Sequence, residues 1–166
     1  MTLTLAAVGA VIAAVIELSL WPYIAIAGAH PHLTFVYVVV LAVVLGLEVG
    51  ATAGFVGGLA LDLLAPRPLG STAFALLIAV ALAVALARLL VQVRLIAPIL
   101  IVFVLSFVFS LVVAGLYAAL GEGIAIDDPI RTLLPGAIYD TLIAAVIGPL
   151  AIAFRARRLE QERVDW

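Results

Sequence analysis

The chain is dominated by long apolar runs that contain no charged residue. Residues 68–87 and 95–121, for example, include no Asp, Glu, Lys or Arg. A helix needs about 20 consecutive apolar residues to cross a bilayer. A soluble domain of 166 residues has too little interior to bury a chain that is 67% hydrophobic. The runs are continuous and not alternating, which favours helices over an outer-membrane barrel. The sequence therefore predicts an all-α integral membrane protein.

Interruptions of these runs divide the chain into six expected transmembrane helices, two of them short, within a single domain over residues 1–166. The expected spans are 3–27, 33–45, 50–65, 72–90, 95–120 and 134–154, followed by a charged tail over 155–166. The two short spans, 33–45 and 50–65, are separated by an expected turn over 46–49. Alternatively, they form one long bent helix. Ser71 is a favourable N-cap for the fourth span.

The distribution of arginine predicts the orientation in the membrane. The chain has eight Arg and no Lys, and cytoplasmic loops carry an excess of these two residue types. With six spans, only Arg67 and Arg131 lie outside. The cytoplasmic side then holds Arg88, Arg94, Arg155, Arg157, Arg158 and Arg163. We therefore expect both termini in the cytoplasm. Because the early loops carry no arginine, the same distribution also fits five spans.

Glycine recurs at every fourth position from Gly46 to Gly58, and the next step of four reaches Asp62. Residues four apart lie on one face of a helix. In membranes, rows of small residues mark faces where two helices pack closely. We expect this row to contact another helix, either from this chain or from a partner protein. The candidate interface residues are Gly50, Gly54, Gly57, Gly58 and Asp62.

Three acidic residues are expected inside the membrane. A helical rise of ~1.5 Å per residue puts Glu17, Asp62 and Asp140 at similar depths in the outer half of the bilayer. Charged residues at such depths usually face a protein interior or a water-filled cavity. One hypothesis is an outer polar pocket formed by Glu17, His30, His32, Asp62, Arg67 and Asp140. The alternative is three unrelated acids that each reach for headgroups or a nearby arginine.

Several residue types that catalysis or metal binding would use are missing. The chain has no Cys and no Lys, which excludes disulfides, thiolate ligands, cysteine nucleophiles and Schiff bases. His30 and His32 have no third ligand beside them, so no metal is expected. No serine stands in a G-x-S-x-G setting. The absence of a basic patch outside the tail argues against nucleic acid as a partner. We expect neither an enzyme nor a cofactor.

Residues 21–77 carry a series of short motifs in a fixed order. Residues 54–62 read G-F-V-G-G-L-A-L-D, preceded by Pro22-Tyr23, Gly28 and Pro31-His-Leu33 and followed by Leu69-Gly70. In this order, on this hydropathy profile, the motifs resemble MreD, the bacterial rod shape-determining membrane protein family. The later spans fit that family by length, and the basic tail is also similar. His32 departs from the polar or acidic residue that the family usually has after Pro31.

The resemblance implies a non-catalytic scaffold in the bacterial cytoplasmic (inner) membrane. MreD-like proteins belong to the elongasome, which synthesises side-wall peptidoglycan. They are expected to bind MreC, a protein with one membrane helix and a periplasmic domain. MreC would connect the chain to RodA, a class B penicillin-binding protein and the MreB filament.

The resemblance also implies a fold similar to the substrate-binding subunits of energy-coupling-factor vitamin transporters. That similarity supplies an alternative function, in which the chain is the substrate-binding subunit of such a transporter. A vitamin site would use aromatic and polar groups in an outer pocket, and this chain offers few aromatic residues there.

Overall fold

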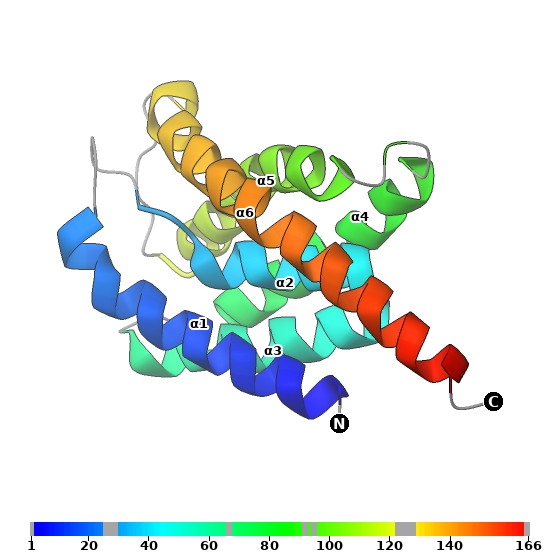
Figure 1. Ribbon diagram of the computed structural model, residues 1–166. Coiled ribbons are helices and arrows are strands. Elements are labelled where there is room, and N and C mark those ends of the chain that lie inside the picture. Colours follow the sequence, from blue (N-terminus) through cyan, green and yellow to red (C-terminus); the bar gives the residue numbers. More distant parts are fainter. Residues whose placement is uncertain are drawn as a thin grey trace.

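The computed structural model describes residues 2–24, 30–65, 68–90, 93, 96–121 and 129–164. In chain order, its helices are α1 (Thr2–Ile24), α2 (Leu33–Leu45), α3 (Leu47–Leu64), α4 (Ser71–Leu89), α5 (Ala97–Ala119) and α6 (Pro129–Val164) (Figure 1). The described residues include no strand, so the prediction of an all-α fold is confirmed. Five of these described helices are long and apolar enough to cross a membrane, as expected for a multi-pass membrane protein.

Two helices differ from the sequence-based expectation in ways that change the architecture. α3 begins at Leu47 and has 18 residues, which makes it about 27 Å long. Among the described helices, only α2 is therefore short, with 13 residues. Its helical part, about 20 Å long, is shorter than a hydrocarbon core of ~30 Å. α6 runs from Pro129 to Val164, so most of the tail expected after residue 154 is helical.

α2 lies at the centre of the bundle. It contacts α1 and α3 on one side and α5 and α6 on the other, and it also contacts α4 (Figure 1). Its residues are apolar on every side, as is typical of a fully buried helix, and Val36, Val38 and Val39 are completely buried. The outer helices instead expose large apolar side chains, including Leu5, Ile12, Phe74, Val104 and Val146. Such a surface suits contact with lipid.

A single residue, Gly46, joins α2 to α3. Its φ of 99° and ψ of 178° lie in a region that is essentially restricted to glycine. The Gly46 N–H donates to the Ala42 carbonyl at 3.0 Å, and the Gly46 carbonyl accepts from the Gly50 N–H at 3.1 Å. The two helices run antiparallel, because Gly50 packs on Ala42 and Gly54 packs on Val38. The turn is thus shorter than the expected turn over 46–49, and the alternative of one bent helix is wrong.

Gly46→Ala should destabilise the protein through its backbone alone. Nothing lies within 4 Å of the position that the new Cβ would occupy, but the required φ and ψ cost about 1–3 kcal/mol for a residue with a side chain. Equilibrium unfolding of the purified protein in detergent measures this loss. The matched control is Gly115→Ala in α5, where a Cβ also meets open space and the backbone is helical. Equal unfolding free energies for the two variants would contradict the argument.

Candidate functional site

The start of α2 lies inside the protein, where its first N–H groups need acceptors. A helix leaves its first four N–H groups without intrahelical partners, and the N-cap residue, His32, makes no side-chain capping bond. Carboxylates from two other helices supply the acceptors. Glu17 Oε2 accepts the Thr34 N–H at 2.8 Å, and Asp140 Oδ1 accepts the His32 N–H at 2.8 Å. Glu17 and Asp140 are 5% and 0% exposed, so both acids are buried at this helix start.

The opposite end of α2 contacts a positive charge. Arg155 of α6 donates from Nη1 to the carbonyl oxygen of Val44, in the last turn of α2. A helix dipole favours negative charge at the N-terminus and positive charge at the C-terminus, each worth about 0.3–1 kcal/mol. α2 is therefore held by carboxylates of α1 and α6 at one end and by a guanidinium of α6 at the other. Sequence reasoning missed this role, because no local pattern links Arg155 to Val44.

Asp140 joins α2, α5 and α6 through one carboxylate. Its Oδ2 accepts the Ser106 hydroxyl of α5 at 2.6 Å and lies 3.1 Å from Nδ1 of His32. The His32 ring packs edge-on against Phe109, with 5.5 Å between the ring centroids. Serine, histidine and aspartate are the residue types of a hydrolase triad. In a triad, however, the serine hydroxyl donates to the histidine, whereas Ser106 donates to the aspartate. This cluster is therefore arranged as a link between helices.

Asp62 caps α4 in a similar way. Its Oδ2 accepts the Gly70 N–H at 2.9 Å, and both carboxylate oxygens lie 3.2 Å from the Thr72 nitrogen. The prediction that Ser71 is the N-cap is wrong, because Gly70 occupies that position with a left-handed φ of 87°. The Ser71 hydroxyl donates to the carbonyl of Pro68 at 2.8 Å. Asp62, which is 2% exposed, therefore supplies the capping acceptor from the preceding helix.

The glycine row of α3 faces other helices of the same chain. A Cβ on Gly50 would meet Ala42 of α2, and one on Gly54 would meet Val38 of α2 and Leu76 of α4. These contacts continue toward Asp62. A Cβ on Gly57 would meet Thr34 of α2 and Ala10 of α1, and one on Gly58 would meet Ala73 of α4. The row is therefore an internal packing face. Asp62 lies one turn further along α3 and contacts the start of α4.

The described residues of the expected outer polar pocket lie at two separate helix starts. Asp140 and His32 are bonded at the start of α2, and the His30 ring lies 5.2 Å from that of His32. Glu17 binds the same helix start. Asp62 instead caps α4. Arg67, the remaining member, lies outside the described residues. The three acids share a capping role that neither hypothesis drawn from the sequence anticipated.

Comparison with known proteins gives one match. The family model described as "rod shape-determining protein MreD" matches residues 1–157. No curated protein and no solved structure matches the chain significantly. The expected similarity to energy-coupling-factor subunits therefore stays a prediction. The family match covers nearly the whole chain. The five long apolar helices of the chain are those of a multi-pass membrane protein. This chain therefore belongs to the MreD family of rod shape-determining membrane proteins.

Proposed function

We propose that this chain is a non-catalytic scaffold of the elongasome that binds the membrane helix of MreC in the bacterial cytoplasmic membrane. The family match over residues 1–157 carries the proposal. Through MreC, the scaffold would support RodA, a class B penicillin-binding protein and the MreB filament during side-wall peptidoglycan synthesis. We assign both termini to the cytoplasm, because that topology puts six of the eight arginines on the cytoplasmic side.

The use of the buried charges supports a scaffold role. Glu17, Asp62 and Asp140 each accept backbone N–H groups at the start of a helix. Acidic residues inside a membrane are costly unless they are paired or functional, and here capping provides their partners. A surface that recruits other proteins must keep its shape. Because α2 is bonded at both ends, the helices that pack around it keep fixed positions relative to one another.

The outer helix faces are the proposed contact surface for MreC. Gly54 and Gly58 of the glycine row pack on α2 and α4, so this face is already occupied by the chain itself. The exposed apolar side chains of the outer helices remain accessible from the membrane. A single partner helix would pack there through van der Waals contact and close fit, as helices do in lipid.

Affinity purification of the tagged protein from its native membrane in mild detergent tests the proposal. Mass spectrometry should identify MreC among the co-purified proteins, with or without RodA and its penicillin-binding partner. An unrelated tagged multi-pass protein from the same membrane is the control for non-specific capture. Recovery of an energy-coupling transmembrane subunit with its ATPases, or of a bound vitamin, would overturn the scaffold proposal in favour of the transporter alternative.

Cysteine cross-linking identifies the face that meets MreC. The chain has no natural cysteine, so single cysteines can be introduced without background. Suitable exposed positions on α1, α4, α5 and α6 are Ile12, Phe74, Val104 and Val146. Val39 in α2 is completely buried and serves as the negative control. Cross-links to a cysteine in the MreC helix should form from one face only. Equal cross-linking from every position, Val39 included, would contradict a specific interface.

A further inference from the structure

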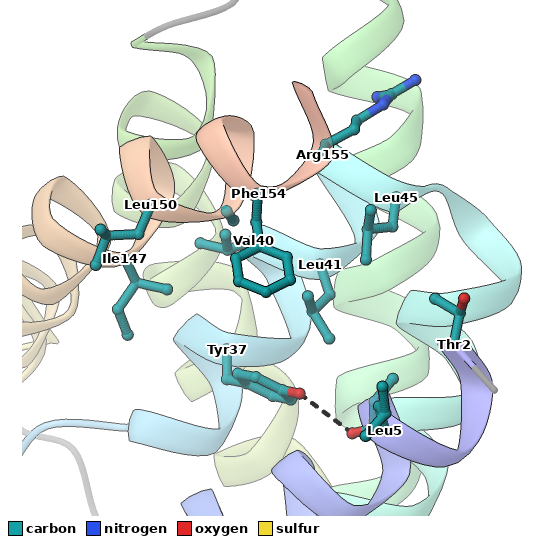
Figure 2. A pocket seen from close by; sticks show the side chains of 12 residues that line it. Thr2, Leu5, Tyr37, Val40, Leu41, Leu45, Ile147, Leu150, Phe154 and Arg155 are labelled. Carbon is teal, nitrogen blue, oxygen red and sulfur yellow. Dashed lines mark hydrogen bonds between the residues drawn. The ribbon is translucent and has the colours of Figure 1, made fainter. Parts of the chain in front are cut away.

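A cavity of about 310 Å³ lies between α1, α2 and α6. Its walls are almost entirely apolar, and Figure 2 shows Phe154 of α6 reaching toward Tyr37 and Leu41 of α2. Leu5 of α1 lines the opposite wall, where the Tyr37 hydroxyl donates to the carbonyl of Ala6 at 3.4 Å. We call this space the α1–α6 cavity. It is separate from the carboxylate caps, because it lies toward the end of α2 that Arg155 contacts.

Arg155 is the one charged residue among those that line the α1–α6 cavity, and Figure 2 shows its guanidinium pointing away from Phe154 and Tyr37, out of the apolar space. Its guanidinium donates to Val44 with Nη1, which leaves further N–H groups on the same planar fork. Within the described part of the chain, no carboxylate forms a salt bridge with Arg155. The residue also lies in the last turn of the apolar segment Leu133–Ala156, so we expect it near the lipid headgroups. Arg157 and Arg158 follow directly in the sequence.

An apolar cavity with a cationic rim matches the chemistry of an anionic phospholipid. Arginine binds phosphate through parallel N–H···O bonds, and basic pockets between transmembrane helices on the cytoplasmic side bind anionic headgroups. A partner helix fits the space less well. A helix with its side chains is about 10–12 Å across, whereas a volume of 310 Å³ is at the lower end of the ~300–1,000 Å³ of small-ligand sites.

We propose that the α1–α6 cavity binds an acyl chain of an anionic glycerophospholipid whose phosphate pairs with Arg155. The lipid would fill the space between the first and last helices and neutralise the arginine that contacts the end of α2. This inference does not depend on MreC, because it concerns the chain alone in a membrane.

Native mass spectrometry of the full-length protein tests this lipid site. The protein is reconstituted with equal amounts of phosphatidylglycerol and phosphatidylcholine that carry the same acyl chains, and the lipids retained after detergent extraction are counted. Phosphatidylglycerol should be retained preferentially. Arg155→Gln should reduce that preference about fivefold, the ratio that corresponds to the ~1 kcal/mol of one arginine near an anionic surface. Because the substitution also alters the contact of residue 155 with Val44, the unfolding free energy of the variant is compared with that of the unmodified protein.

Two matched controls separate a specific site from general attraction to the membrane. Arg88→Gln removes the same charge from the last turn of α4, outside the cavity, and should leave lipid retention unchanged. Ala151→Phe fills the cavity from α6 and should reduce retention of both lipids, whereas Ala145→Phe, at an exposed position of the same helix, should not.

Three results would overturn the lipid site. The first is equal retention of phosphatidylglycerol and phosphatidylcholine by the unmodified protein. The second is an equal loss of preference in Arg88→Gln and Arg155→Gln, which would indicate a diffuse charge effect. The third is unchanged lipid retention in Ala151→Phe together with loss of MreC co-purification, which would make a protein helix the occupant. Because the lipid assay uses the purified chain, failure to recover MreC leaves its outcome unaffected.

Discussion

Gly58→Ala should weaken the fold more than any other single-methyl addition along the glycine row. The new Cβ would lie 2.3 Å from the Cα and 2.6 Å from the nitrogen of Ala73 in α4. Both are backbone atoms, so no side-chain rotation relieves the overlap, and α3 and α4 must move apart. Overpacking of this kind typically costs about 1–3 kcal/mol, and rigid backbone atoms put Gly58 at the upper end of that range. Equilibrium unfolding in detergent measures the loss.

A graded series provides the controls for Gly58→Ala. At Gly54, a Cβ would lie 3.2 Å from a methyl carbon of Val38, a side-chain atom that can shift slightly, so Gly54→Ala should have an intermediate effect. At Gly115, nothing lies within 4 Å, so Gly115→Ala should be neutral or stabilise α5 by up to ~1 kcal/mol. A series in which Gly54→Ala is more damaging than Gly58→Ala would contradict the contact geometry.

Asp140→Ala should produce a loss of similar or greater size through a different mechanism. The substitution removes the acceptor of the His32 N–H and of the Ser106 hydroxyl at a site that is 0% exposed. Each buried polar group left unsatisfied costs about 1–3 kcal/mol, so we expect a total of about 2–6 kcal/mol from the two groups. Unfolding in detergent gives the free energy, and cell shape in a strain that depends on this protein gives the functional consequence.

Two further variants separate the contributions of Asp140. Asp140→Asn keeps one carbonyl oxygen that can accept the His32 N–H, so it should recover part of the lost stability. Ser106→Ala removes a single hydroxyl and should cost about 1 kcal/mol. A double-mutant cycle of Asp140→Ala with Ser106→Ala should then show strong coupling, because the two residues share one hydrogen bond. Additive effects of the two substitutions would contradict a shared network.

The helices were predictable from the sequence, because the signals for them are local. Apolar runs with few charged residues mark the segments that form α1 to α6, and proline, glycine or polar residues mark the loops between them. The glycine row likewise indicated a close helix contact on α3, since spacing by four is a property of one helix. Its neighbours were not predictable, because the row itself does not specify that Gly58 meets Ala73 and Gly50 meets Ala42.

The role of the acids was not predictable for a similar reason. Their depth in the membrane follows from counting residues, but their partners are backbone N–H groups, which leave no pattern in the sequence. His32 and Asp140 are 108 positions apart, and Glu17 reaches the start of a helix that begins 16 residues later. The shortness of α2 was the one available signal. A helix that ends inside the membrane requires capping groups from its neighbours, and buried acids are suitable acceptors.

The separation between His32 and Asp140 also has a consequence for how this protein is made. Ribosomes add about 5–20 residues per second, so Asp140 is synthesised roughly 5–20 s after His32. During that interval Glu17 is already present, but the second carboxylate and Arg155 are not, and α2 is too short to cross the bilayer alone. In the nascent chain, α2 therefore lacks part of its capping while α3, α4 and α5 are inserted. Insertion of α6 brings Asp140 and Arg155 to the two ends of α2 and so completes its capping.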